Sequence, residues 1–175
     1  MFRFMKPAQG APLARSLARA GMIAAMYMVL TLIMPFTLSF GPVQFRLAEA
    51  LMLLPLLTAD AIPGLFVGCL IANLVGGGVW FDVALGSLAT LLAAIFAYLW
   101  RDKPPLAAFS AVLFNGLIVG PVVYFAYVRA PGEAVSGLAL LSCVGSVAFG
   151  ELVVCYALGL PLYYALRRLP RKLFH

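Results

Sequence analysis

The sequence predicts an all-α integral membrane protein that folds as a bundle of six transmembrane helices. Of its 175 residues, 65% are hydrophobic and only 10% are charged, and the mean hydropathy is +1.06; a soluble domain carries about 25% charged residues. The apolar runs are continuous, whereas the strands of a membrane barrel would alternate between apolar and polar residues, so the spans are expected to be helices. The basic residues gather at the two ends and in one connection, which is typical of cytoplasmic ends and loops.

The net charge of +6 follows from this topology and does not indicate a nucleic-acid partner. Basic side chains precede the first apolar run, follow the last one, and include Arg101 and Lys103 in mid-chain. Because both ends are basic, both are expected in the cytoplasm, which requires an even number of crossings. Six crossings meet this condition and also place Arg101 and Lys103 inside.

The expected elements form a single membrane domain, residues 17–168, between a basic N-terminal tail, residues 1–16, and a C-terminal tail, residues 169–175. Its apolar segments are 17–39, 47–58, 61–75, 82–100, 106–127 and 134–166. The first run is longer than the roughly 7–15 residues of a signal-peptide core, so it is expected to remain as a span. The second is short against the roughly 20 residues needed to cross a bilayer, so it is expected to be re-entrant or tilted. The last exceeds one bilayer thickness, and a bend is expected at Gly159 and Pro161.

The sequence contains few residues that could form a metal site or a catalytic site. Its cysteines, Cys69, Cys143 and Cys155, lie in apolar runs without CxxC spacing, which favours buried small side chains over a metal site or a disulfide framework. The single histidine is His175, so neither a histidine-ligated metal nor histidine-based catalysis is expected. The sequence also has no P-loop pattern. We therefore expect no cofactor, no metal and no enzymatic activity, and an ATP-driven step would need another protein.

Polar residues in the outer half of the bundle are the candidates for a ligand site. They are Arg46 and Glu49 at the start of the second segment, Asn73, Trp80 and Asp82 around a glycine run, and Asn115 and Glu151 near mid-depth. A charged side chain inside the bilayer costs about 2.5–3.5 kcal/mol on insertion scales, so these carboxylates need partners. Arg46 and Glu49 share a helical face, which would also fit a purely structural ion pair. On the outer side only Arg46 and Arg129 could neutralise the three carboxylates, and this shortage favours a ligand site.

The chemistry of these side chains suits a neutral or cationic planar heterocycle with N–H donors. Carboxylates accept hydrogen bonds and attract cations, asparagine both donates and accepts, and an aromatic ring can stack on a flat solute. A phosphate or a polyanion would fit poorly. Three simpler interpretations remain open: Trp80 as an interfacial anchor, Asp82 as a helix cap, and residues 76–78 as a plain glycine turn.

The first apolar run carries small residues four positions apart. Ala20 and Ala24 form one such pair, and Gly21 and Ala25 form a second, one position along. In a membrane this spacing lets another helix approach closely. The neighbour is either a helix of the same chain or a partner protein.

Four long blocks of the sequence carry a resemblance to a known family. They read FGPVQFRLAEALMLLP, AIPGLFVGCLIANLVGGGVWFDVALGSLATLLAA, VLFNGLIVGPVVY and FGELVVCYALGLPLYYALRR. Together they resemble the QueT family, which are substrate-binding S components of energy-coupling factor (ECF) transporters, a type of ABC importer. The resemblance covers nearly the whole chain after about Arg15.

The resemblance implies a six-helix S component in the plasma membrane of a bacterium, with both termini in the cytoplasm. It implies that the protein binds a deazaguanine-type queuosine precursor or queuine from outside. Delivery inward would need one transmembrane coupling protein and two ATPase subunits. The first helix of such components docks on the coupling protein through an AxxxA pattern, which Ala20 and Ala24 match and for which Gly21 and Ala25 offer a second register.

The ligand that the resemblance implies fits the candidate residues. A guanine-like edge presents N–H donors to a carboxylate, and an aminomethyl group would add a cation for a second one. The expected main carboxylates are Glu49 and Glu151, and the expected amide partners are Asn73 and Asn115. Trp80 is expected to stack on the ligand or act as a lid, and Arg46 to orient Glu49. Asp82 is a weaker candidate, because it could simply cap the fourth helix.

Three alternatives remain at this point. The protein could be an S component for a different vitamin-like heterocycle. It could be a stand-alone proton-coupled carrier with Glu151 as the proton site. It could also be a small intramembrane enzyme using Glu151 and Asp82 as acid and base, although the sequence lacks a serine-nucleophile motif and clustered cysteines. Dependence on a separate ATPase module would distinguish the first from the other two.

Overall fold

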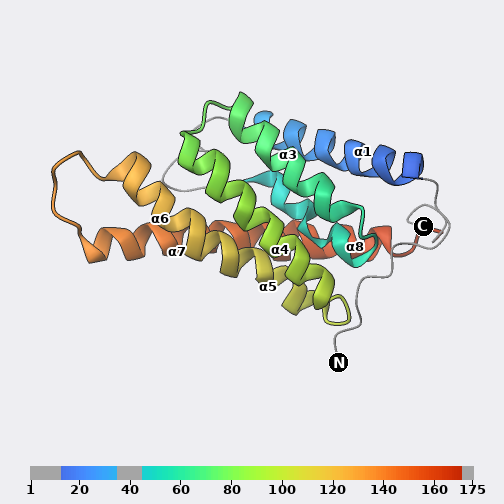
Figure 1. Ribbon diagram of the computed structural model, residues 1–175. Helices are drawn as coiled ribbons and strands as arrows, with labels where there is room; N and C mark the ends of the chain where they lie inside the picture. Colours follow the sequence, from blue (N-terminus) through green and yellow to red (C-terminus); the bar gives the residue numbers. More distant parts are fainter. Residues whose placement is uncertain (1–12, 35–44, 171–175) are drawn as a thin grey trace.

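The computed structural model describes residues 13–34 and 45–170, and all regular structure in these two ranges is helical. The predicted all-α class is therefore confirmed. Six helical rods follow one another along the chain (Figure 1). They are α1 (Leu13–Leu32); η1 (Leu47–Leu56); α3 (Ala61–Val75); η2 (Asp82–Gly86) with α4 (Ser87–Leu99); α5 (Pro104–Phe114) with η3 (Asn115–Val119), α6 (Gly120–Val123) and η4 (Tyr124–Val128); and α7 (Gly137–Val154) with η5 (Cys155–Gly159) and α8 (Leu160–Leu166).

Four of the rods in the described part of the chain are long and apolar enough to cross a membrane. These are Leu13–Leu32, Asp82–Leu99, Pro104–Val128 and Gly137–Leu166. Leu47–Leu56 and Ala61–Val75 are apolar but shorter. The second segment is thus as short as its sequence predicts, and it is a 3-10 helix of 10 residues.

The first helix begins earlier than the sequence predicts. Helix α1 already begins at Leu13, so residues 13–16 belong to the first helix and not to the tail. Ser16 takes part in this packing, since its hydroxyl donates a 2.5 Å hydrogen bond to Oδ1 of Asp60. The predicted continuation of this span to residue 39 falls partly in residues 35–44, outside the described residues, as do the ends of both tails.

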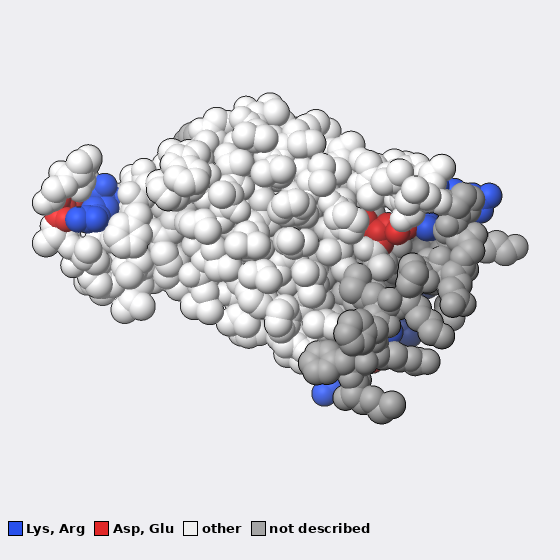
Figure 2. All heavy atoms as spheres, viewed as in Figure 1, with Lys and Arg blue, Asp and Glu red and all other residues white. Residues whose placement is uncertain are grey.

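Consecutive rods run in alternating directions, so their connections gather at two ends of the molecule (Figure 1). The start of α1, the connection between α4 and α5, and the end of α8 lie at one end. The connections from α3 to η2 and from η4 to α7 lie at the other. Figure 2 shows charged atoms near these two ends and an uncharged face between them. This arrangement fits an even number of crossings, with Arg101, Lys103 and Arg168 exposed at the same end.

Helices α1 and α3 pack closely because both present small residues to each other. A Cβ atom added to Gly64 would lie 2.7 Å from the carbonyl oxygen of Ala20, and one added to Gly68 would lie 2.8 Å from that of Ala24. The backbones therefore meet where α3 has no side chains, as small residues at this spacing allow. This contact fixes α1 against the bundle and turns Tyr27 into its interior, where it is fully buried.

Non-α turns interrupt the last two rods at points that the sequence explains. Pro121 and Pro161 lack an amide hydrogen and cannot bond to the carbonyl four residues earlier. The π turns Asn115–Val119 and Cys155–Gly159 lie directly before these prolines. At Gly159 and Pro161, where the sequence predicts a bend, the structure has the π turn that joins α7 to α8.

Candidate functional site

The polar candidates lie on or beside the non-α turns, which face one another inside the bundle. Glu49 is in the 3-10 helix η1, Asp82 is in the π turn η2, and Asn115 begins the π turn η3. Glu151 lies in α7, one turn before η5. Single π turns inside helices are frequent at functional sites, because the altered register re-aims side chains and leaves backbone groups open.

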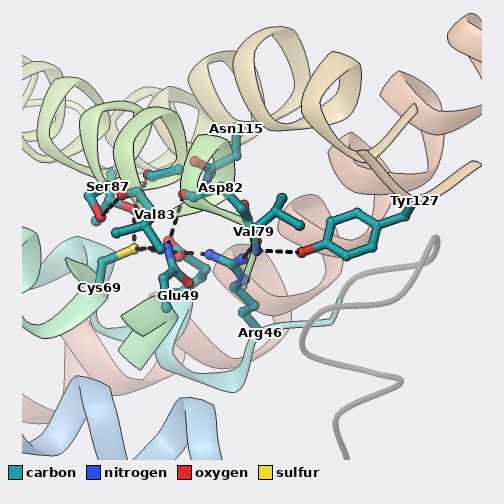
Figure 3. A network of polar contacts seen from close by, with 12 residues as sticks. Arg46, Glu49, Cys69, Val79, Asp82, Val83, Ser87, Asn115 and Tyr127 are labelled. Atoms are coloured by element: carbon teal, nitrogen blue, oxygen red, sulfur yellow. Dashed lines mark hydrogen bonds and ion pairs between the residues drawn. The ribbon is translucent and has the colours of Figure 1, made fainter. Parts of the chain in front are cut away.

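One half of the cluster surrounds an ion pair and is called the arginine subsite, formed by Arg46, Cys69, Asn73, Asp82 and Thr90. Figure 3 labels Arg46, Cys69 and Asp82 of this subsite. Nη2 of Arg46 lies 3.5 Å from Oδ2 of Asp82, and both side chains are almost fully buried. The Asn73 amide donates to the Asp82 carbonyl oxygen at 3.3 Å and approaches Sγ of Cys69 at 3.5 Å. The hydroxyl of Thr90 lies 3.3 Å from the same sulfur atom.

The other half contains two acidic side chains and is called the carboxyl subsite, formed by Tyr27, Glu49, Asn115, Glu151 and Cys155. The Tyr27 hydroxyl donates to Oε1 of Glu49, and the Asn115 amide donates to Oε1 of Glu151 at 2.8 Å. Sγ of Cys155 lies 3.5 Å from the carbonyl oxygen of Glu49 and 3.9 Å from Oε2 of Glu151. The two glutamates are therefore neighbours, although 102 positions separate them in the sequence (151 − 49).

The two subsites adjoin each other through the start of η1. The amide of Glu49 donates to the carbonyl oxygen of Arg46 at 3.0 Å, so the residues that anchor the two halves are bonded through the backbone. All the polar candidates here are buried, with exposed fractions between 0% for Asn73 and Asp82 and 7% for Glu151.

Three buried oxygen atoms in this cluster have no hydrogen-bond partner among the described residues. They are Oε2 of Glu49, Oδ1 of Asn73 and Oδ1 of Asp82. Each is an acceptor, and a buried polar atom without a partner costs about 1–3 kcal/mol. Native interiors contain few such atoms, so three in one cluster make it the candidate ligand site of the described residues.

The charges in the cluster are also unbalanced. Among the described residues Arg46 is the only buried basic side chain, while Glu49, Asp82 and Glu151 are all buried. The ion pair that forms joins Arg46 to Asp82. Glu49 and Glu151 instead contact neutral groups, the hydroxyl of Tyr27 and the amide of Asn115.

The structure brings together six of the seven ligand-site candidates: Arg46, Glu49, Asn73, Asp82, Asn115 and Glu151. Trp80 is not buried with them: its side chain is 69% exposed and packs on the ring of Phe81 with centroids 4.1 Å apart. Asp82, the weaker candidate, lies in the first turn of its rod and pairs with Arg46. The ion pair expected as the simplest interpretation, Arg46 with Glu49, is thus replaced by Arg46 with Asp82 in the fourth rod.

Sequence reasoning missed four members of the cluster: Tyr27, Cys69, Thr90 and Cys155. Tyr27 could have been found, since it follows Ala20 and Ala24 on the same helical face at the spacing i, i+4, i+7. The cysteines are buried free thiols, as expected, but nothing in their apolar surroundings distinguishes Cys69 and Cys155 from Cys143, which lies in the apolar core.

The glycines beside the arginine subsite let its side chains pack directly against the backbone. A Cβ atom added to Gly86 would lie 3.1 Å from Oδ1 of Asp82 and 3.2 Å from the Asn73 amide nitrogen. One added to Gly78 would lie 3.4 Å from Oδ2 of Asp82. Gly77 has φ +73°, a left-handed conformation that side chains disfavour, so the glycine run makes a tight turn next to the subsite.

The two small-residue pairs of the first helix face in different directions. Ala20 and Ala24 contact α3, and Ala24 is only 8% exposed. Gly21 and Ala25 are exposed, and a Cβ atom on Gly21 would meet nothing within 4 Å. The first pair is therefore used within the chain, while the second lies on the outer face of α1.

Comparisons with known proteins identify the family of this chain. A family model described as QueT transporter matches residues 17–168. A curated relative, the queuosine precursor transporter QueT of Lactococcus lactis subsp. cremoris (strain MG1363), is 33% identical over 82 residues, which is 46% of this chain and 48% of the relative. The match spans about half the length of that relative, and no solved structure matches significantly. Since the family model covers most of its length, this chain belongs to the QueT transporter family.

Proposed function

We propose that this protein is the substrate-binding S component of an ECF-type importer, and that it takes up a deazaguanine-type queuosine precursor or queuine across the plasma membrane of a bacterium. The observation that carries the proposal is the buried cluster, in which three acceptors, on Glu49, Asn73 and Asp82, have no partner within residues 13–34 and 45–170. A guanine-like heterocycle presents several N–H donors on one edge, and such donors are what these acceptors lack. The family membership supports a queuosine precursor as the source of that heterocycle.

The site is built for binding rather than for catalysis. Its side chains are acidic, amide, hydroxyl and thiol groups enclosed by helices, and intramembrane ionisable groups of this kind generally serve substrate recognition or translocation. The sequence has no P-loop pattern, so we propose that a coupling transmembrane protein and two ATPase subunits supply the driving force.

The outer face of α1 is the proposed docking surface for the coupling protein. Gly21 and Ala25 let a partner helix approach closely, and the exposed apolar residues Met22, Met26 and Val29 flank them. An apolar hollow alongside α1, lined by Ala25, Met26, Val29 and Leu30, adds concave shape to this face. Ala20 and Ala24, which match the AxxxA pattern, would reach a partner only if α1 left α3.

Ligand binding to the purified protein in detergent tests the proposal. Binding stabilises the folded state by RT ln(1 + [L]/Kd), so a ligand at about 100 times its Kd adds about 2.7 kcal/mol. Deazaguanine precursors and queuine are compared with guanine, biotin, thiamine and riboflavin by thermal unfolding. We expect a shift only with the deazaguanines. A shift with another vitamin would keep the S-component role and reject the queuosine assignment.

Dependence on an ATPase module separates an S component from a stand-alone carrier. Uptake is measured in proteoliposomes with and without the coupling protein and its ATPases. An S component should bind its ligand alone but transport it only with the module and ATP. ATP-independent uptake by the chain alone would instead support the proton-coupled carrier.

A further inference from the structure

We propose that the two subsites recognise different parts of the ligand. The carboxyl subsite binds a protonated amine, and the arginine subsite binds the N–H edge of the heterocycle. This inference rests on the proposed function and selects, among queuosine precursors, those that carry an amine on the side chain of the deazaguanine. A precursor with a neutral nitrile in that place would be a poor ligand.

The carboxyl subsite is the half that needs a cation. Glu49 and Glu151 are both buried, and Sγ of Cys155 contacts the backbone carbonyl oxygen of the first and Oε2 of the second. Their hydrogen-bonding partners, Tyr27 and Asn115, are neutral. A neutral donor satisfies the hydrogen-bonding capacity of a carboxylate without offsetting its charge, whereas an ammonium group does both.

The structure also leaves this half an open acceptor. Oε2 of Glu49 is buried and unpartnered among the described residues. Oε2 of Glu151 is approached by the thiol of Cys155 at 3.9 Å, which is a weak donor at a long distance. An ammonium group has three N–H donors, so one amine can bridge two carboxylates and retain a donor.

The arginine subsite suits the uncharged edge of the heterocycle. Asp82 already pairs with Arg46, so its charge is offset within the protein. Its remaining oxygen, Oδ1, and Oδ1 of Asn73 accept no hydrogen bond from any described residue. Both residues pack against the bare backbone of Gly86, where an added Cβ atom would lie 3.1 Å from Oδ1 of Asp82 and 3.2 Å from the Asn73 amide nitrogen. Two neighbouring acceptors match two adjacent N–H donors, such as the ring and exocyclic N–H groups of a guanine edge.

The experiment compares three ligands that differ only in the deazaguanine side chain: aminomethyl, ethyl and cyano. The ethyl compound has nearly the size and shape of the aminomethyl compound but no charge. Calorimetric Kd values are measured for the wild-type protein in detergent, and for the Glu49→Gln and Glu151→Gln variants, with Glu133→Gln as the matched control in an exposed loop. Glutamine keeps the size and an acceptor oxygen but removes the negative charge.

We expect the wild-type protein to bind the aminomethyl compound at least about tenfold more tightly than the other two, as a charge-assisted hydrogen bond would give. In Glu49→Gln or Glu151→Gln this preference should fall to about threefold or less. The Glu133→Gln variant should keep the full preference.

Other results would overturn the inference in distinguishable ways. Equal binding of all three compounds by the wild-type protein would reject the amine subsite and leave the proposed function intact, and this result does not depend on whether a variant folds. A full preference in both glutamine variants would reject Glu49 and Glu151 as its location. Binding of none of the three by folded protein would overturn the proposed function as well.

Discussion

The phenolic hydroxyl of Tyr27 donates a hydrogen bond to Oε1 of Glu49, and this bond connects the first helix to the polar cluster. Tyr27 is fully buried and follows Ala24, which packs on α3, by three residues (27 − 24). The opposite face of the same helix carries the exposed Gly21 and Ala25. One helix therefore contacts the candidate ligand site on one side and presents the proposed docking surface on the other.

Removing the hydroxyl of Tyr27 should destabilise the protein and weaken ligand binding. In Tyr27→Phe, Glu49 loses the donor to Oε1, and its Oε2 is already unpartnered among the described residues. A buried hydrogen bond to such a group contributes about 1–3 kcal/mol. Thermal unfolding in detergent should show a lower midpoint than for the wild type. Tyr164→Phe, on an exposed side chain of α8, is the control and should unfold like the wild type. If both variants unfold alike, the bond has no measurable role.

Breaking the buried ion pair should be much more damaging than breaking an exposed contact. Arg46→Met leaves Asp82 as a buried charge without its guanidinium partner, which costs about 3–5 kcal/mol of unfolding free energy. The control is Arg129→Met, because Arg129 is only partly buried and its contact is with the backbone oxygen of Glu133 in an exposed loop. We expect that variant to lose less than about 1 kcal/mol.

A double variant separates the structural role of this pair from its role in binding. In Arg46→Met with Asp82→Leu no buried charge is left alone, so much of the lost stability should return. Ligand binding should not return, because the acceptor Oδ1 of Asp82 is absent. Recovery of both properties, measured by thermal unfolding and calorimetry, would show that the pair has a structural role alone.

The close contact between α1 and α3 should not tolerate a methyl group. In Gly68→Ala the new Cβ would lie 2.8 Å from the Ala24 carbonyl oxygen, and the helices must separate to relieve the overlap. Overpacking of this kind costs about 1–3 kcal/mol. Gly145→Ala in α7 is the matched control, since its Cβ would meet nothing within 4 Å. That variant should be neutral or stabilising by up to about 1 kcal/mol, because alanine favours helix more than glycine does. Equal melting temperatures of the two variants would contradict the packing described for α1.

Enlarging the exposed small residues of α1 should block transport without affecting binding. Gly21→Leu and Ala25→Leu place a bulky side chain on the proposed docking face, where the protein itself has space. We expect normal ligand binding by the isolated protein, and loss of ATP-dependent uptake when the partner module is present. Gly145→Leu, at an exposed position of α7, should transport normally. Ala24→Leu should instead destabilise the protein itself, because Ala24 faces α3. Normal uptake by both Gly21→Leu and Ala25→Leu would place the docking surface elsewhere.

The sequence by itself determined the fold class, the number of helical segments and their order. Continuous apolar runs and the distribution of basic residues are local properties of the chain, and in a bilayer each apolar run must satisfy its own backbone as a helix. The same reasoning found six of the polar residues in the cluster, because a charged or amide side chain is conspicuous in an apolar segment. It placed Trp80 in the site only because tryptophan can stack on a heterocycle, a property that does not fix where the ring points.

Only the tertiary structure decided which residues meet. Arg46 pairs with Asp82 and not with Glu49, because rods far apart in the sequence bring their turns together inside the bundle. In the same way, Ala20 and Ala24 contact α3, whereas Gly21 and Ala25 are exposed on the outer face of α1, although both pairs have the same spacing. Spacing along one helix defines which residues share a face, but the partner of that face depends on the other helices. The unpartnered oxygens of Glu49, Asn73 and Asp82 could be recognised only once the neighbours of each atom were known.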